Sequence, residues 1–299
     1  MKLDLTQMST ERRNPNTMDL DRMDPLELVT VMNREDRKVP EAIQPALPRI
    51  AQAVRWAIES IEAGARIIYM GAGTSGRLGV LDAVECPPTF GVSPETVVGL
   101  IAGGERAFVK AVEGAEDSRE LGREDLEKIR LCREDLVIGI AASGRTPYVL
   151  GGLDYARLLG CHTAAISCNP GSAIGQAAEL AIEVVPGPEV LTGSTRLKAG
   201  TCQKLILNMI STATMVSCGK AYENLMVDVV QTNEKLQVRA QNIVMEATGV
   251  SRQEAEEALR EASGSSKLAI TMILRNCSRP EAEACLRAAK GHVREAIKA

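Results

Sequence analysis

Residues 65–76 read ARIIYMGAGTSG, an apolar run that ends in glycines and hydroxyl side chains. A continuous apolar run of this length is typical of a strand that is buried on both faces of a sheet. The same pattern, a short apolar run, a Gly/Ser-rich turn and a helix-length segment, recurs four more times, at 96–103, 135–143, 162–168 and 180–185. Five such repeats predict an α/β fold, a doubly wound, flavodoxin-like parallel sheet of five strands.

The chain on either side of these repeats has a different character. Residues 1–50 are charged and rich in proline, and they predict a helical arm with one helix from Pro25 to about residue 36. A second helix is expected from Leu47 to about residue 63, leading into an α/β domain over 51–222. Residues 223–299 carry no strand signal and predict a small helical domain.

An internal repeat marks the helical domain. Residues 250–270 and 277–297 are identical at 11 of 21 positions, at an offset of 27. Each copy begins with a capping box, in which a serine is followed three residues later by a glutamate, and is expected to end at a glycine. These residues are Ser251 with Glu254 and Ser278 with Glu281 at the starts, and Gly264 and Gly291 at the ends.

Composition narrows the function. The net charge is −4, whereas nucleic-acid binding usually needs a basic excess, so no nucleic-acid partner is expected. The chain contains two histidines and eight cysteines without a CxxC pair, which argues against a metal site and for free thiols in a reducing compartment. With neither a leader peptide nor an apolar stretch of membrane-spanning length, the chain is expected to be cytoplasmic, with no membrane partner.

The turn at 71–76 matches the pattern GxGxxG, which by itself is a weak signal for a dinucleotide site. Such a site needs an acidic residue about 20 positions later, and the chain there reads PPTFGVSP. The hydroxyls favour another interpretation: Gly73, Thr74 and Ser75 open a helix, whose free N–H groups and dipole attract an anion such as phosphate. A glycine-rich turn with capping hydroxyls and no ligand stays open as the alternative.

A second turn of this kind follows the third predicted strand. It contains Ser143, Gly144, Arg145 and Thr146, and Pro147 is suited to the first turn of a helix. Because ligands bind at the carboxyl ends of parallel strands, both turns are expected to face one crevice that holds a compact sugar phosphate.

A third polar cluster, residues 192–201, opens the helix after the last predicted strand. Ser194, Thr195 and Lys198 are further candidates for phosphate binding, with Arg196 beside them, although basic residues at a helix start are as often simply solvated. Asn169 and Ser172, in the turn after the fourth strand, are secondary candidates.

Several segments together resemble the N-acetylmuramic acid 6-phosphate etherases, a family with the sugar isomerase (SIS) fold. They are GAGTSGRLGVLDAVECPPTFGV, AVEGAED, GIAASGRTPY, ISCNPGSA, EVLTGSTRLKAGTCQK and NLMVDVVQTNEKL. One departure from the family pattern is Val84, where a small residue is expected. The related glucokinase regulatory proteins share the fold and TGSTRLKAGT but are longer, with two SIS copies, and this chain has room for one.

The resemblance implies cleavage of the D-lactyl ether at C3 of N-acetylmuramic acid 6-phosphate. The products would be N-acetylglucosamine 6-phosphate and D-lactate, formed by elimination and then addition of water, with no cofactor and no metal. By resemblance, Glu85 is the proton donor and Glu116 its catalytic partner. Glu113, three residues before Glu116, is expected on the same helical face and competes for that role.

The position of Glu85 predicts an assembly. Pro87 and Pro88 are expected to end the helix that begins near Ser75, which puts Glu85 at a helix end, where the dipole disfavours an anion and so suits a proton donor. Ten residues of straight helix separate Ser75 from Glu85 by ~15 Å, too far for one hexose phosphate. Unless the helix breaks early, near Gly79, we expect a homodimer in which Glu85 completes the neighbouring subunit's site. A non-catalytic protein that senses sugar phosphates is the alternative function, since it needs the two turns but neither glutamate.

Overall fold

The computed structural model describes residues 8–110, 112–230 and 233–298, which form two compact units. The first, here called the α/β unit, comprises the chain up to Val84 and residues 95–211. The second, the C-terminal unit, comprises Glu85–Pro94 and the chain from Thr212 onward. The domain boundaries predicted at residues 50 and 222 stay a prediction.

The centre of the α/β unit is a five-stranded parallel sheet with the order β2-β1-β3-β4-β5, which confirms the predicted fold class. Both neighbouring central strands, β1 and β3, are buried along their whole length, as continuous apolar runs require. The strands are β1 (Ile67–Gly71), β2 (Val97–Ile101), β3 (Leu136–Ala141), β4 (His162–Ser167) and β5 (Leu180–Glu183).

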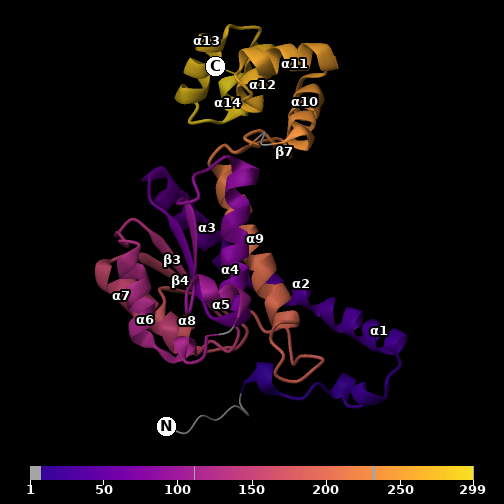
Figure 1. Cartoon of the computed structure of the whole chain (residues 1–299), viewed down its shortest axis with the longest axis vertical. Coiled ribbons are helices and arrows are strands. Elements are labelled where there is room, and N and C mark those ends of the chain that lie inside the picture. Colours follow the sequence, from indigo (N-terminus) through magenta and orange to yellow (C-terminus); the bar gives the residue numbers. More distant parts are fainter. Residues whose placement is uncertain (1–7, 111, 231–232, 299) are drawn as a thin grey trace. The chain divides into compact units, whose positions relative to one another are not determined.

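Helices cover both faces of the sheet (Figure 1). On one face α6, α7 and α8 pack against alternate strand residues such as Ile68, Met70 and Val137, and α3, α4 and α9 lie on the other. The helices of this unit are α1 (Pro25–Asp36), α2 (Lys38–Ile43), α3 (Leu47–Glu62), α4 (Gly73–Phe90, which ends in the C-terminal unit), α5 (Glu105–Val109), α6 (Arg119–Lys128), α7 (Pro147–Leu159), α8 (Ala173–Ala177) and α9 (Lys198–Ser217, which also continues into the C-terminal unit). Short 3-10 helices are η1 (Ser9–Glu11), η2 (Pro15–Thr17), η3 (Leu20–Arg22), η4 (Gln44–Ala46) and η5 (Ala115–Asp117).

The prediction that Pro87 and Pro88 end the first helix of the sheet domain is wrong. α4 contains both prolines and continues to Phe90. The two stand together in its last turn, so the hydrogen bonds that proline cannot donate are lost only there. The helix ends at Gly91, which has φ +60° and donates its N–H to the Pro87 carbonyl, a common glycine stop.

Gly79 does not break α4 either. A Cβ at this position would lie 3.0 Å from Cβ of Tyr69 and 3.3 Å from Cδ1 of Ile140. The glycine therefore brings the helix close to β1 and β3. Its role is packing, and α4 is continuous from Ser75 to Glu85.

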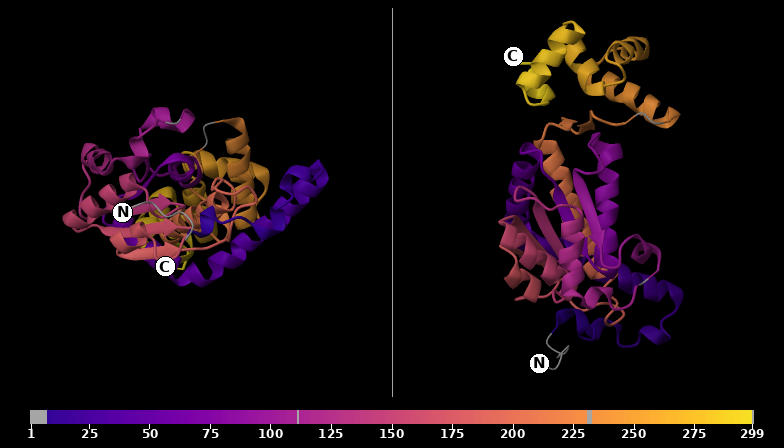
Figure 2. Two further views of the ribbon diagram at one scale, coloured as in Figure 1. Left: turned by 90° about the horizontal axis from the view of Figure 1, so that it is seen from below. Right: turned by 60° about the vertical axis from the view of Figure 1, so that its left-hand side comes forward.

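Among its described residues, the strands of the C-terminal unit are limited to one antiparallel pair, β6 (Ala221–Tyr222) and β7 (Leu225–Met226), two residues each and too short to leave a sequence pattern. Its helices, orange to yellow in Figure 2, are α10 (Glu234–Thr248), α11 (Arg252–Glu261), α12 (Ser266–Arg275), α13 (Arg279–Ala288) and α14 (Val293–Ala296). Both predicted capping boxes are present at the starts of α11 and α13. Each copy of the repeat is thus a helix, a turn through a left-handed glycine and the start of a second helix.

Candidate active site

The two hydroxyl-rich turns follow neighbouring strands, as predicted. β1 pairs with β3 in parallel, with Gly71 opposite Ile140, so the turns after these strands leave the same edge of the sheet. The strand order reverses between β1 and β3, and such switch points are where open α/β sheets bind ligands. The turns therefore lie where the predicted sugar-phosphate site requires them.

The first turn brings the backbone of β1 against the start of α4. A Cβ at Gly76 would lie 2.6 Å from the Gly71 carbonyl oxygen, so this approach needs glycine. Gly73, with φ +52°, begins the helix, and Thr74 and Ser75 occupy its first turn. The Ser75 hydroxyl donates to Oε1 of Gln203 on α9 at 3.0 Å, while the buried Nε2 of Gln203 makes no hydrogen bond within the described chain.

The second turn keeps its hydroxyls unengaged. Within the described residues, the side chains of Ser143 and Thr146 make no hydrogen bond, and Thr146 precedes α7 without capping it. Gly144, with φ +73°, lies so close to Ser172 that an added Cβ would be 2.3 Å from the serine Cβ. Arg145 is exposed beside them.

The third cluster is different, because its lysine is already neutralised. Lys198 is buried, and its ammonium lies 2.7 Å from Oε2 of Glu35 on α1. Glu189 accepts the backbone N–H groups of Lys198 and Ala199 and so caps the start of α9. Ser194 and Thr195 are half-buried and Arg196 is exposed. The phosphate-binding role of Lys198 stays a prediction. Glu35, the acid that neutralises the Lys198 ammonium, was missed by the sequence interpretation.

Glu35 is held as an anion by four donors. Burial alone would raise its pKa, but hydrogen bonds from Lys198, Lys38, Asn16 and Asn14 lower the pKa from its ordinary value of 4.5 to about 2. Both asparagines belong to the segment before η3, so this carboxylate joins the N-terminal arm to the start of α9.

The secondary candidates Asn169 and Ser172 have structural partners. The Asn169 side chain accepts from Ser9 and donates to Thr10 and to the Ala142 carbonyl. It therefore fixes the backbone directly before the second turn. The Ser172 hydroxyl caps α8 by accepting from the Gly175 N–H, and it donates to Glu183.

A cavity of about 200 Å³ joins the first turn to the acidic segment 112–117. Its lining includes Ala72, Gly73 and Arg77 together with Glu113, Gly114 and Glu116, but none of the hydroxyl side chains of the two turns. The structure thus brings Glu116 to the proposed phosphate turn. The expected helical pairing of Glu113 with Glu116 is wrong, since Glu113 lies in a turn, Gly114 has φ +76° and only Glu116 belongs to η5. Both carboxylates nevertheless face the same cavity.

Glu85 lies on an exposed position of α4, five residues before the helix ends and beyond the reach of its last-turn dipole. The expectation that it stands at the helix terminus is therefore wrong. The separation from Ser75 remains: ten residues of uninterrupted helix amount to ~15 Å of rise.

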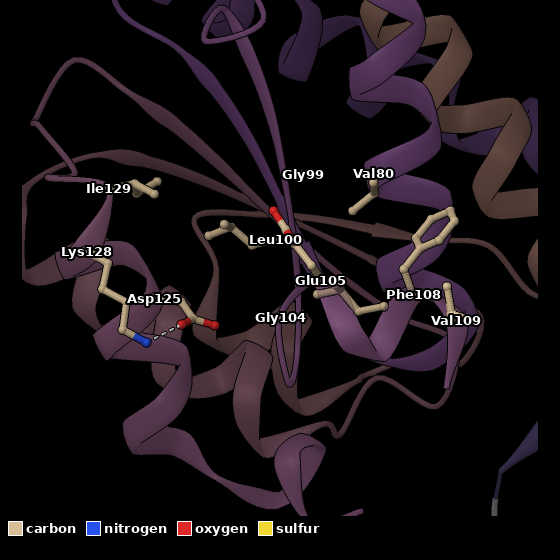
Figure 3. Close-up of a pocket in the computed structure, with 11 residues that line it drawn as sticks. Val80, Gly99, Leu100, Gly104, Glu105, Phe108, Val109, Asp125, Lys128 and Ile129 are labelled. Carbon is tan, nitrogen blue, oxygen red and sulfur yellow. Dashed lines mark hydrogen bonds and ion pairs between the residues drawn. The ribbon is translucent and has the colours of Figure 1, made fainter. Parts of the chain in front are cut away.

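A larger, apolar cavity of about 570 Å³ lies at the edge strand β2, between α5 and α6 (Figure 3). Leu100, Phe108 and Ile129 line it, and none of the residues predicted for the site does. Across the described ranges, no three His, Cys, Asp or Glu side chains are grouped to hold a metal ion. Over the same ranges, no helix is long and apolar enough to cross a membrane.

Comparison with known proteins first defines a class. Residues 49–157 match the model of the glucokinase regulatory protein N-terminal SIS domain, and residues 122–213 match the SIS domain model. A solved structure from Bacteroides fragilis, described as a phosphosugar isomerase involved in capsule formation, shares the fold, with a TM-score of 0.50 and 18% identity over 66% of this chain and 94% of that one.

Full-length relatives then narrow the class. The chain is 60% identical to the N-acetylmuramic acid 6-phosphate etherase of an Exiguobacterium species, over 98% of this chain and 100% of the relative. It is 57% identical to the enzyme of the same name from Halalkalibacterium halodurans, over 98% of each chain. The chain therefore belongs to the N-acetylmuramic acid 6-phosphate etherase family.

Proposed function

We propose that this chain is a carbon–oxygen lyase that cleaves the D-lactyl ether of N-acetylmuramic acid 6-phosphate, in the recycling of cell-wall amino sugars. The products are N-acetylglucosamine 6-phosphate and D-lactate. The observation that carries the proposal is the cavity in which the first hydroxyl-rich turn meets Glu116. A phosphate anchor beside a carboxylate is the minimum that binding and deprotonating a sugar phosphate require.

The 6-phosphate is bound by the starts of α4 and α7. Backbone N–H groups and hydroxyls supply the donors, from Gly73, Thr74, Ser75, Ser143, Gly144 and Thr146, with Arg145, Ser194 and Thr195 as further candidates, whereas the Lys198 ammonium is buried against Glu35. The Ser75 hydroxyl must leave Gln203 to donate to phosphate, and the amide can then turn its unpaired Nε2 toward the serine oxygen.

The chemistry needs a base and an acid. Glu116 takes the proton from C2 as the C3–oxygen bond breaks, a C2–C3 double bond forms, and Glu85 protonates the departing lactyl oxygen. Water then adds, its hydroxyl to C3 and its proton to C2. Because α4 is unbroken between Ser75 and Glu85, we assign Glu85 to a second copy of the chain, so that the working form is a homodimer with shared sites.

A cytoplasmic location is part of the proposal, and the thiols support it. All eight cysteines are free, and several are buried, which suits a reducing cytoplasm.

The direct test is incubation with N-acetylmuramic acid 6-phosphate and an assay for D-lactate. Glu116→Gln should lower kcat by ~10²–10⁴, the usual contribution of a general acid or base, while Glu113→Gln serves as its matched comparison in the same cavity. Absence of D-lactate from the wild-type protein would refute the activity, and the reverse pattern would assign the base to Glu113.

Subunit mixing tests the shared site. Glu85→Gln and the double variant Ser75→Ala/Ser143→Ala should each be inactive, the first through lost proton donation and the second through lost phosphate binding. After subunit exchange, half of randomly formed dimers are mixed, and each mixed dimer has one intact site, so activity should return to about one quarter of wild type. No recovery despite demonstrated exchange would place Glu85 and the phosphate turns within one chain.

A further inference from the structure

We propose that Arg77 binds the carboxylate of the lactyl group and so selects the ether substrate over sugar phosphates that lack it. This inference rests on the proposed function and adds a specificity-determining residue to it. Arg77 is the fifth residue of α4, two residues after Ser75, and the sequence interpretation assigned it no role.

Arg77 is held in place by the backbone. Its Nε donates to the Phe108 carbonyl and its Nη2 to the Ala107 carbonyl, both at 2.8 Å, at the end of α5. The remaining nitrogen, Nη1, makes no hydrogen bond with any part of the chain that the structure describes. The guanidinium is thus fixed in orientation and keeps one donor group for a ligand.

The charges of the cavity call for a cation. Its titratable lining residues are Arg77, Glu113 and Glu116, and among the described residues no ion pair joins the arginine to either acid. A substrate that brings a carboxylate near two glutamates would be repelled unless a fixed positive charge balanced it. Arg77 is the one lining residue, of those described, that can do so.

The position matches the order of atoms on the sugar. C2, which loses its proton to Glu116, is bonded to C3, which carries the lactyl ether, so a base that reaches C2 has the lactyl group beside it. Arg77 lines the same small cavity as Glu116. Guanidinium also suits a carboxylate because it stays charged and its remaining N–H group can donate a charge-assisted hydrogen bond.

The competing explanation is structural: Arg77 would only tie α5 to α4 through the two carbonyls. The two roles differ in ligand dependence. The substrate has a phosphate and a carboxylate, whereas N-acetylglucosamine 6-phosphate has the phosphate alone. Loss of carboxylate recognition should therefore affect one ligand and spare the other.

The test is calorimetric binding of both ligands to Arg77→Met and Arg77→Lys in a Glu116→Gln background, which slows turnover. Affinity for N-acetylmuramic acid 6-phosphate should fall ~10–100-fold in Arg77→Met and less in Arg77→Lys, as expected for a charge-assisted hydrogen bond. Affinity for N-acetylglucosamine 6-phosphate should stay within about twofold. Arg106→Met, which removes an exposed arginine of α5 outside the cavity, is the matched control and should change neither.

Equal weakening of both ligands would overturn the inference and assign Arg77 to the phosphate. Unchanged affinities together with a lower unfolding temperature would also overturn it, in favour of the structural role. A wild-type protein that binds the muramic ligand through Arg77 but releases no D-lactate would refute the proposed activity and leave this inference standing.

Discussion

Residues 71–76 and 192–201 are both rich in glycine and hydroxyls, and both precede or open a helix, yet the structure uses them differently. The first contains no charged side chain and borders a cavity that also holds Glu116. The second contains two cations: Arg196 is exposed, but the Lys198 ammonium is buried against Glu35. A cation in a motif is therefore no measure of the positive charge a ligand can reach; its burial and partners decide that.

Removing Glu35 should give the largest change in stability. In Glu35→Ala the Lys198 ammonium would stay buried without its partner, which costs roughly 3–5 kcal/mol in the free energy of unfolding. Urea unfolding measures this loss. Lys38→Met removes the half-exposed partner of the same carboxylate and should cost under ~1 kcal/mol. If Glu35→Ala lowered the free energy of unfolding by less than ~1 kcal/mol, the Lys198 ammonium would be free to reach solvent. The difference drawn here between residues 71–76 and 192–201 would then be wrong.

Acid should weaken the same contact without any mutation. The pKa of Glu35 in the folded chain is lowered from 4.5 to about 2, so its stabilisation is fully present above pH 4.5 and is lost as the pH falls toward 2. The loss over this window is about 3 kcal/mol. Between pH 6 and 2, the free energy of unfolding should depend less on pH in Glu35→Gln than in wild type. An equal pH dependence in the two proteins would show that another group governs acid unfolding.

The smallest expected effect is on ligand affinity, which should not depend on the second segment. Ser75→Ala and Ser143→Ala should each weaken binding of N-acetylglucosamine 6-phosphate by roughly 1.5–3 kcal/mol, the contribution of a hydrogen bond to a charged oxygen. Thr192→Ala, at an exposed position of the second segment, is the control and should leave the affinity unchanged. Calorimetry that finds both serine variants unchanged would remove the phosphate from the starts of α4 and α7.

Much of the fold could be predicted because its signals are local. The five continuous apolar runs are five parallel strands, and the helix predicted from Pro25 is α1, which the structure shows to begin with a capping box of Asp24 and Glu27. The errors arose where local chemistry was overridden by packing. Pro87 and Pro88 are tolerated in a last turn that Gly91 closes. The alternative of an early break at Gly79 does not occur, because this glycine serves close contact with Tyr69.

The site could be predicted in part. Adjacency of the two hydroxyl-rich turns follows from the strand order, which the repeat of apolar runs already suggests. The pairing of Lys198 with Glu35 joins residues 163 positions apart and has no sequence signal. The sequence interpretation assigned no role to Arg77, because its partners are backbone carbonyl oxygens, which every residue carries and which leave no sequence signal.

The unbroken α4 also limits how its sequence can change in length. Each residue inserted between Ser75 and Glu85 would turn every later side chain by about 100° and advance it by ~1.5 Å, with no loop to absorb the change. Single insertions and deletions there would point Glu85 in a new direction, while substitutions on the solvent side would leave its direction intact. The number of residues between Ser75 and Glu85 therefore matters more to the direction of the Glu85 side chain than the identity of those residues does.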